Sequence, residues 1–265
     1  MLPKIDLVKC TDADYLLLST DDAITSHLRH RGAWEPHLVA ISRMFVHGIV
    51  EPLILDIGAN LGAYAIPLAK AIDSAKGMIY AYEPQRIVYY QLCGNIFLNR
   101  LDNVFAFCKA IGDADGSINI PSLDFGKTSN VGGFSLVDDI RQKTNYVVVQ
   151  SDKPPIETPL SRLDSNQFPK APCLIKIDVE GYDLKVLSGG VNLLESGNFP
   201  PILFEAWNFD WYQAEKDRLF EFLQRLGYEI TPIFGDDYVA QHPANPIHID
   251  FITDGNGRFN MTRVR

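Results

Sequence analysis

The sequence is poor in cysteine and in cationic residues, and it contains no long apolar run. Only four of the 265 residues are cysteines, and none of them forms a CxxC pair, which argues against a zinc site. Asp and Glu number 33 against 24 for Lys and Arg. The resulting net charge of −9 disfavours a nucleic-acid partner, because such binding depends on neutralising phosphates. No segment approaches 18 uninterrupted apolar residues, so no membrane span is expected.

The N-terminal region carries a short apolar run with acidic flanks and no cleavage site, so it is not a secretory signal. Together with cysteines that are predicted to be free thiols, this indicates a cytoplasmic protein. Residues 1–50 are predicted to form a helical prelude that packs on the core. One helix is expected to begin at Asp21-Asp22, and a second is expected from Trp34-Glu35-Pro36 to about Val46.

From residue 51 onward, short apolar strands alternate with helical patterns, which predicts an α/β domain over residues 51–265. The expected strands cover residues 53–56, 78–82, 104–108, 174–177, 201–205, 228–234 and 248–252. The expected helices cover residues 61–71, 87–98, 184–196 and 215–226. We predict a Rossmann-like, seven-stranded and mostly parallel sheet with a late antiparallel strand and with helices on both faces.

Residues 116–165 interrupt this alternation. Glycine and proline divide them into short segments, among which strands are expected at 117–120, 134–136 and 146–150. A connection of this length inside an α/β domain is usually functional or mobile. No motif in it identifies a substrate.

A glycine-containing turn follows the first strand of the domain, in the sequence LDIGANLG. Asp56, Gly58, Asn60 and Gly62 stand at the carboxyl end of that strand, where open α/β sheets bind ligands. Asn60 replaces the second glycine of the dinucleotide fingerprint GxGxxG, and Asp56 adds a negative charge that would repel a pyrophosphate. The turn therefore favours a ligand with a positive centre.

Glu83 ends the second strand and would accept hydrogen bonds from both hydroxyls of a ribose. The DxGxNxG turn together with this acidic strand end favours S-adenosylmethionine as the cofactor, with S-adenosylhomocysteine as its product. The alternative is a glycine turn with Asn60 as a helix cap, and Glu83 as a solvated residue before Pro84.

Three carboxylates and a lysine follow the strand at 174–177, in the sequence KIDVEGYD. Alternate strand residues share one face, so Lys176, Asp178 and Glu180 would lie together beside the glycine turn. Asp178 is a candidate general base or metal ligand, and Lys176 would keep nearby carboxylates ionised. Glu180 would position an acceptor or cap the next helix, whereas Asp183 is expected only to favour the start of that helix.

Glu205 ends the next strand and is a second candidate base, or else a buried acid paired with Lys176. We predict catalytic roles for Asp178, Glu180, Glu205 and Lys176, and no metal site. A divalent cation at these oxygen ligands is the alternative. Phe209, Trp211 and Tyr212 follow closely, and they either pack in the core or stack on a sugar ring.

Five blocks of the sequence resemble, in order, the signature blocks of the FkbM-type methyltransferase family. They are LDIGANLGAYA, YAYEP, KAIGD, LIKIDVEGYDLKVLSGG and ILFEAWN, and the preceding Gly32-Ala-Trp34-Glu35 is similar to the block that leads into that domain. The resemblance runs from about residue 21 to 235. It implies a class I methyltransferase fold, S-adenosylmethionine as methyl donor, and O-methylation of a sugar or another small molecule.

Carried over by position, the resemblance implies which residues hold the donor. They are Asp56, Gly58, Ala59, Asn60 and Gly62 in the turn, Glu83 at the ribose and Ile111 near the adenine. Two other functions are kept as alternatives, an NAD-dependent oxidoreductase and a non-catalytic S-adenosylmethionine-binding module. Asn60 argues against the first, and the intact DIGAN and KIDVEG blocks argue against the second.

Overall fold

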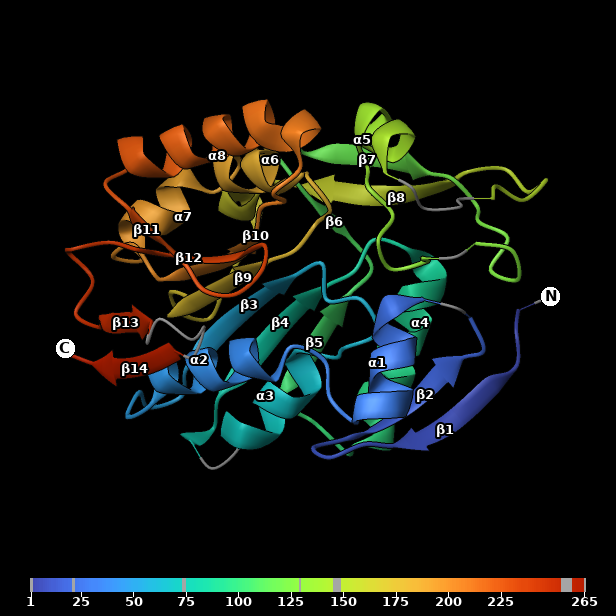
Figure 1. Ribbon diagram of the computed structural model, residues 1–265, viewed down its shortest axis with the longest axis horizontal. Coiled ribbons are helices and arrows are strands. Elements are labelled where there is room, and N and C mark those ends of the chain that lie inside the picture. The colour runs from blue at the N-terminus through green and yellow to red at the C-terminus, as the bar shows by residue number, and fades with distance from the viewer. Residues whose placement is uncertain are drawn as a thin grey trace.

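The computed structural model describes residues 2–20, 22–72, 75–128, 130–144, 149–253 and 259–264 (Figure 1). The chain opens with a hairpin of β1 (Ile5–Lys9) and β2 (Asp14–Leu18), which the sequence did not predict. The two expected helices follow as α1 (Ala23–Arg31) and α2 (Pro36–Val46). Asp22 caps α1 by accepting a hydrogen bond from the Thr25 N–H at 2.8 Å, while Asp21 lies outside the described residues.

The predicted seven-stranded, mostly parallel sheet is confirmed, in the order β11-β12-β10-β9-β3-β4-β5. Its strands are β3 (Leu53–Ile57), β4 (Met78–Tyr82), β5 (Val104–Phe107), β9 (Leu174–Ile177), β10 (Ile202–Glu205), β11 (Glu229–Pro232) and β12 (Asp237–Gln241). Only β12 runs antiparallel to its neighbours. The carboxyl ends of the six parallel strands therefore share one edge of the sheet.

The strand expected at 248–252 is present as β13 (Ile249–Thr253), but it lies outside this sheet. It pairs instead with β14 (Phe259–Arg263) in a separate two-stranded sheet. The side-chain amide of Gln241 binds both the N–H and the C=O of Ile249, at 2.8 and 2.9 Å. The Gln241 side chain thus forms hydrogen bonds with the backbone at the start of β13. The antiparallel strand of the seven-stranded sheet is instead β12, which forms a short hairpin with β11.

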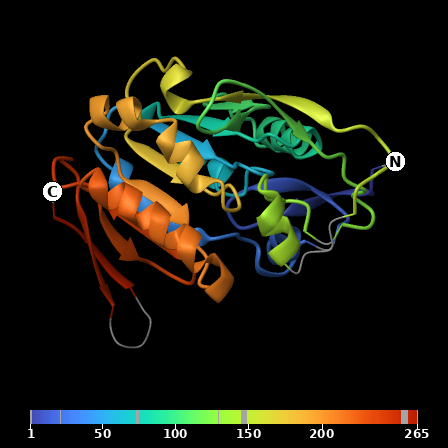
Figure 2. The same ribbon diagram turned by 90° about the horizontal axis from the view of Figure 1, so that it is seen from above.

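Helices cover both faces of the sheet, as Figures 1 and 2 show. They are α3 (Ala65–Ile72), α4 (Arg86–Leu98), α6 (Asp183–Ser188), α7 (Val191–Ser196) and α8 (Gln213–Arg225). One apolar cluster joins Ile54 to helices α1 to α4, and another joins its neighbour Leu55 to helices α6 to α8. This alternation places Asp56 on the same face as Ile54.

The single helix expected over residues 184–196 is instead the pair α6 and α7, which separate at Gly189-Gly190. A Cβ at Gly189 would lie 1.9 Å from the carbonyl oxygen of Gly112, so the chain turns where two backbone segments touch. The helix expected from residue 61 begins only at Ala65, because the glycine turn occupies the intervening residues.

The insertion at 116–165 forms much of a small three-stranded sheet with order β6-β8-β7, and a helix, α5 (Asp138–Lys143). Its strands are β6 (Ala110–Ile111), β7 (Gly116–Ile120) and β8 (Ile156–Ser161). The strand expected at 117–120 is confirmed, and no strand forms at 134–136. Most of the one expected at 146–150 lies outside the described residues, although Gln150 bridges Leu123.

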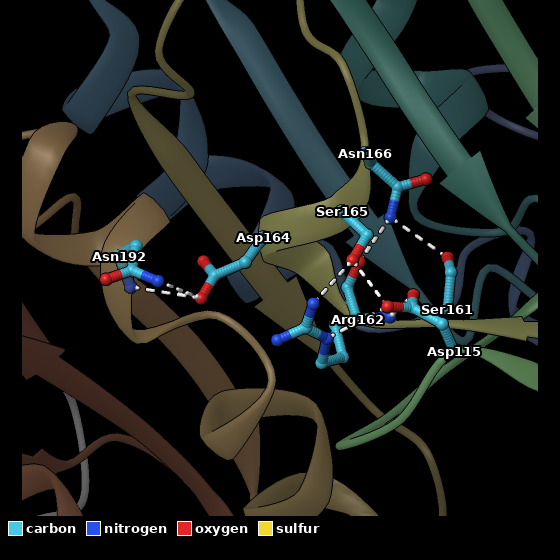
Figure 3. A network of polar contacts seen from close by, with 7 residues as sticks. All are labelled: Asp115, Ser161, Arg162, Asp164, Ser165, Asn166 and Asn192. Carbon is cyan, nitrogen blue, oxygen red and sulfur yellow. Dashed lines mark hydrogen bonds and ion pairs between the residues drawn. The ribbon is translucent and has the colours of Figure 1, made fainter.

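A polar network fastens the base of this insertion to the main domain (Figure 3). The Asp115 carboxylate accepts hydrogen bonds from the Arg162 Nε and the Ser165 hydroxyl, at 3.0 and 2.7 Å. The Asp164 carboxylate accepts from the Asn192 side chain and from the Leu193 N–H, at 2.9 and 2.8 Å, and so caps α7. The two ends of the insertion are therefore tied together and to α7.

Amide side chains on α4 fasten the N-terminal hairpin. Buried Asn95 accepts a hydrogen bond from the Leu16 N–H at 2.6 Å and donates one to the Leu61 carbonyl at 2.9 Å. One turn further along, Asn99 accepts from the Asp14 N–H at 3.0 Å. Asn95 thus links the hairpin, α4 and the glycine turn that contains Leu61.

We expect Asn95→Ala to lower the free energy of unfolding by about 2–4 kcal/mol, because it leaves two backbone groups without a partner in a dry environment. Asn99→Ala is the comparison, because Asn99 binds the N–H and the C=O of Asp14 and the Asn95 carbonyl but is only half-buried and does not reach the turn, so its loss should cost less. Urea unfolding of the two variants measures the difference. Equal losses would show that the Leu61 contact contributes nothing.

Candidate active site

A cleft opens at the carboxyl ends of β3, β4, β9 and β10. Of the predicted site residues, the structure brings seven together along its walls: Gly58, Asn60, Glu83, Ile111, Asp178, Glu180 and Glu205. Asp56, Ala59, Gly62 and Lys176 lie behind this lining and are buried or packed against it. The cleft is therefore built where the sequence predicted a ligand site.

The glycine turn after β3 needs glycine at its first position. Gly58 has φ of +85°, and a Cβ there would lie 1.8 Å from the carbonyl oxygen of Asp178. The N–H groups of Gly58 and Ala59 both donate to the Tyr82 carbonyl, at 3.0 and 2.9 Å. The turn is thus held between the ends of β4 and β9, and its shape is fixed by both.

Glu83 closes the turn from the other side. One carboxylate oxygen accepts the Asn60 N–H at 3.0 Å, and the other accepts the Gln85 N–H at 2.8 Å. Burial raises the pKa of Glu83 to about 7, although these two backbone bonds act in the opposite direction. Glu83 therefore shapes the turn as well as lining the cleft, and its contact with a ribose stays a prediction.

Lys176 lies at the centre of the acidic residues behind the cleft. Its ammonium is 3.0 Å from an Asp178 oxygen and 3.6 Å from an Asp56 oxygen. Burial lowers the pKa of Lys176, but the surrounding carboxylates Asp178, Asp56 and Glu35 outweigh burial and hold it above its ordinary value. Lys176 therefore stays cationic and acts as the counter-ion of this group, and its catalytic role stays a prediction.

Asp56 is fully buried on β3, directly opposite Lys176 in the register of β3 with β9. Neither of its oxygens accepts a hydrogen bond from any described residue, so Lys176 acts on it through charge alone. Burial raises the pKa of Asp56 to about 6, and Lys176 opposes this shift. Asp56 therefore adds negative charge directly behind the wall of the cleft, with the Lys176 ammonium as its nearest cation.

Glu180 and Glu205 complete the acidic wall. β9 ends at Ile177, so Glu180 does not continue the strand as expected but has φ of +54°, in the left-handed region. Glu205 accepts a hydrogen bond from the Trp207 indole N–H at 2.8 Å. Burial, followed by the charge of Asp178, raises the pKa of both acids well above the ordinary value.

Two further acids belong to this group, and the sequence did not predict a site role for either of them. Burial, with Asp178 next, raises the pKa of Glu35 to about 8, and Glu35 lines the cleft from the N-terminal region. Asp183 does begin α6 as expected, but it is 2% exposed, and burial raises its pKa to about 7. Glu35 precedes a proline and was visible only as part of the GAWE block.

The insertion supplies a wall of the cleft that no sequence motif predicted. Asn130, Gly132, Gly133, Phe134 and Leu136 all line it. A Cβ at Gly132 would lie 2.1 Å from the Asn60 side-chain nitrogen, and the Gln85 amide donates to the Val131 carbonyl at 3.0 Å. The adjacent glycines Gly132 and Gly133 were the only sequence signal of this contact, because they allow the insertion to approach the glycine turn closely.

The acid-rich wall does not form a metal site within the part of the chain that the structure describes. No three of its His, Cys, Asp and Glu side chains are arranged to hold a metal ion there. The same acids do match the two cationic centres of S-adenosylmethionine, its sulfonium and its ammonium. The carboxyl groups that line the cleft are the ones that would meet them, with Asp56 behind the wall.

The strand order, the single reversed strand and the glycine turn beside an acidic strand end define a class I methyltransferase fold. Residues 56–230 match the family model of the methyltransferase FkbM domain, which covers most of the chain. The protein therefore belongs to the FkbM methyltransferase family, as the sequence blocks indicated.

Individual relatives are more distant. A hexuronic acid methyltransferase, AglP, from Haloferax volcanii is 29% identical over 152 residues, which are 56% of this chain and 54% of that protein. The matched part thus spans about half the length of that relative. A tRNA(Phe) (4-demethylwyosine(37)-C(7)) aminocarboxypropyltransferase from Methanocaldococcus jannaschii is 42% identical over 52 residues, 20% of each chain. The crystal structure of methyltransferase FkbM from Methylobacillus flagellatus aligns with a TM-score of 0.44 and 16% identity, over 82% of this chain and 52% of that chain.

We expect Gly132→Ala to weaken binding of S-adenosylmethionine, the donor that the family implies, by roughly tenfold. The new methyl group would displace the Asn60 side chain from the turn, while the backbone of residue 132 would not be strained. Gly126→Ala is the control, because its Cβ would lie 3.4 Å from its nearest neighbour, an ordinary contact. Calorimetric titration measures both affinities, and equal affinities would show that the insertion does not contribute to donor binding.

We also expect the free energy of unfolding of the ligand-free protein to fall as pH rises from about 6 to about 8. Glu35 has a folded-state pKa of about 8 against 4.5 when unfolded, so between these values the folded protein holds a proton that the unfolded chain releases. This stabilisation is complete at low pH and is lost as pH rises through the folded-state pKa.

Urea-unfolding midpoints measured across this pH range test the direction of the change in stability. Glu35→Gln should reduce the dependence of the midpoint on pH. Asp115→Asn is the control, because bonds from Ser165 and Arg162 lower the pKa of the exposed Asp115 to about 2, far below the range. A wild-type stability that rises with pH would contradict the raised pKa assigned to Glu35.

Proposed function

We propose that the protein is a cytoplasmic, S-adenosylmethionine-dependent O-methyltransferase that methylates a hydroxyl of a sugar or another small molecule. The observation that carries the proposal is the charged pair of Lys176 and Asp178, 3.0 Å apart at the edge of the cleft and packed against the glycine turn. Family membership supports the methyl-transfer chemistry. We take residues 51–265 as the methyltransferase domain, with residues 1–50 as a prelude that supplies Glu35.

In this proposal the donor is held by the turn from Asp56 to Gly62. The ribose lies at Glu83, and the adenine lies near Ile111, which also lines the cleft. Asp56 lies behind the wall of the cleft and would act on the cationic end of the donor through its charge, without touching it. Binding of a cation would lower the pKa of the acids around it, so donor binding and release of their protons are coupled.

Methyl transfer forms a bond from the acceptor oxygen to the methyl carbon and breaks the bond from that carbon to sulfur. The sulfonium becomes a neutral thioether, and the hydroxyl proton passes to a carboxylate. A hydroxyl is a weak nucleophile at neutral pH and therefore needs a group that accepts its proton within hydrogen-bond reach. Asp178 aligns the acceptor oxygen in this scheme, with Glu180 or Glu205 beside it.

Burial and the charge of Asp178 raise the pKa of Glu180 and Glu205 well above the ordinary value, a kind of perturbation that is typical of groups that transfer protons. Lys176 binds the Asp178 carboxylate at 3.0 Å and fixes its orientation, so the aligning group does not reorganise during the reaction. Positioning and electrostatics would then provide most of the acceleration, because no covalent intermediate is required. A metal-assisted route is disfavoured by the chemistry of this arrangement, in which an ammonium already occupies the centre of the acids.

We expect Asp178→Asn to lower kcat by roughly 10²–10³-fold while S-adenosylmethionine binding changes little, because the variant removes the group that aligns the acceptor oxygen but not the turn. Release of labelled product from S-adenosylmethionine across a panel of acceptors gives kcat, and calorimetry gives donor affinity. Asp113→Asn is the matched control, since Asp113 forms an exposed ion pair with Lys185 away from the acidic wall. Undiminished kcat for Asp178→Asn would overturn the role given to Asp178.

A further inference from the structure

Among the acids that line the cleft in the described part of the chain, only Glu35 comes from outside residues 51–265. The family model begins at residue 56, so Glu35 also lies outside the matched domain. Its carbonyl accepts the Leu38 N–H at 3.0 Å where α2 begins, but its side chain does not cap that helix. The carboxyl group of Glu35 is therefore not used by its own helix and faces the cleft instead.

The position of Glu35 is fixed by the start of α2. Pro36 is the first residue of this helix, and the Nε2 of the next residue, His37, lies 2.7 Å from an Asp237 oxygen on β12. Leu38 is buried in the apolar cluster below. Glu35 itself has φ of +41°, a conformation that residues other than glycine keep only where their surroundings require it. Its carboxyl group is therefore held in place before any ligand binds.

Glu35 belongs to a group of three acids around a single ammonium. The charges of Asp178, Asp56 and Glu35 all act on Lys176. Lys176 forms ion pairs with Asp178 and Asp56, and among the residues that the structure describes Glu35 has no ion-pair partner of its own. Burial, followed by the charge of Asp178, accordingly raises the pKa of Glu35 to about 8, although Lys176 opposes this shift. A cationic group beside Glu35 would lower this pKa and stabilise the ionised carboxylate.

The other acids of the wall have different surroundings. Glu83 accepts hydrogen bonds from two backbone N–H groups, and Glu205 accepts one from an indole N–H. Glu180 faces the insertion, since its Oε1 would lie 3.1 Å from a Cβ on Gly133. Glu35 is thus the acid of the wall that stands beside the Lys176 group with its carboxylate turned to the cleft.

The proposed path of the donor ends beside Glu35. Strands β5, β4, β3 and β9 are neighbours in this order, with Glu83 after β4, the glycine turn after β3 and Asp178 after β9. A donor with its ribose at Glu83 and its sulfur near the turn would point its amino-acid end toward β9. At that end Glu35 and Asp178 line both the cleft and a small cavity behind it.

We infer that Glu35 binds the α-ammonium of S-adenosylmethionine, so that residues 1–50 complete the donor site. The ammonium donates to the Glu35 carboxylate, while Asp178 keeps its bond to Lys176 and aligns the acceptor. Charge-assisted hydrogen bonds of this kind are roughly twice as strong as neutral ones. This inference rests on the proposed function and adds a donor contact from outside the matched family domain.

The test uses S-adenosylhomocysteine, whose only cationic group at neutral pH is the ammonium, and two ligands that each lack one group of its amino-acid end. 5′-S-(3-Aminopropyl)-5′-thioadenosine lacks the carboxylate, and 5′-S-(3-carboxypropyl)-5′-thioadenosine lacks the ammonium. We expect Glu35→Gln to weaken binding of the two ligands with an ammonium by roughly tenfold and to change binding of the third little. Calorimetric titration gives the dissociation constants. An equal loss for all three ligands would indicate a structural role for Glu35 and would overturn the inference.

Glu180→Gln is the matched control, because Glu180 is another half-buried glutamate of the same wall but faces the insertion. It should affect the three ligands alike. A loss in Glu180→Gln that is confined to the two ligands with an ammonium would assign the ammonium to Glu180 and overturn the inference.

Proton release is a second measurement, and a role in packing alone would not change it. At pH 7 the free protein is partly protonated at Glu35, and an ammonium beside it favours the ionised form, so ligand binding should release protons. The charged groups around Glu35 also respond to the ligand, and they are Asp178, Lys176, Asp237 with its partner His37, Glu180 and Glu205. Titration of S-adenosylhomocysteine in buffers of different ionisation enthalpy counts the protons. We expect Glu35→Gln to release fewer than the wild type, and equal numbers would contradict the contact.

The wild-type protein separates this inference from the proposed function. If it binds neither S-adenosylmethionine nor S-adenosylhomocysteine, the proposed function itself is wrong. If it binds both and Glu35→Gln shows no selective loss, the proposed function stands and only the role of Glu35 is removed.

Discussion

The buried ammonium of Lys176 is the contact on which the functional end of the sheet depends. It lies between β3 and β9, the two central strands, and carries the only positive charge that faces both Asp56 and Asp178 among the described residues. An unpaired charge in such a place is very costly, and removal of one partner from a buried pair usually costs about 3–5 kcal/mol. The ion pair therefore fixes how the ends of these strands face each other. The position of the glycine turn depends on the same contact, because Gly58 packs directly on the Asp178 carbonyl.

Three of the eight described non-glycine residues with positive φ line the cleft. Glu35, Asn60 and Glu180 all have positive φ, at 41°, 50° and 54°, and all three line the cleft. Residues other than glycine adopt this conformation at a cost, and they keep it only where the surroundings leave no alternative. Here the surroundings are the ion pair behind the wall and the insertion in front of it. The cleft is thus preorganised by elements from three separate parts of the sequence.

Much of this arrangement could be predicted, since residues at the ends of parallel strands must meet at one edge of the sheet. Asp56, Glu83, Asp178 and Glu205 were found in this way, and the sheet and its family followed from the same blocks. Glu35 could not be placed, because its position depends on how α2 packs on the sheet rather than on its local pattern.

The role of the insertion in the cleft could not be predicted for a related reason. Its contact with Asn60 is made by a glycine, which has no side chain to suggest a role. The break between α6 and α7 likewise depends on a distant carbonyl, that of Gly112, which no local pattern reveals. Local chemistry was therefore predictable from sequence, whereas contacts made by backbone against backbone were not.

Because carboxyl groups outnumber cations in the cleft, the ionisation of its acids depends on whether the donor is bound. Without a ligand, burial raises the pKa values of Asp56, Glu83 and Glu35 to about 6, 7 and 8, so these acids are partly protonated near neutral pH. A sulfonium and an ammonium entering the cleft would supply positive charge and favour the ionised forms. When the methyl group leaves, the sulfonium charge disappears while the proton of the acceptor arrives, so the net charge of the cleft is unchanged. A wall of partly protonated acids can accept that proton without a large change in field, which suits this site to methylate a neutral hydroxyl.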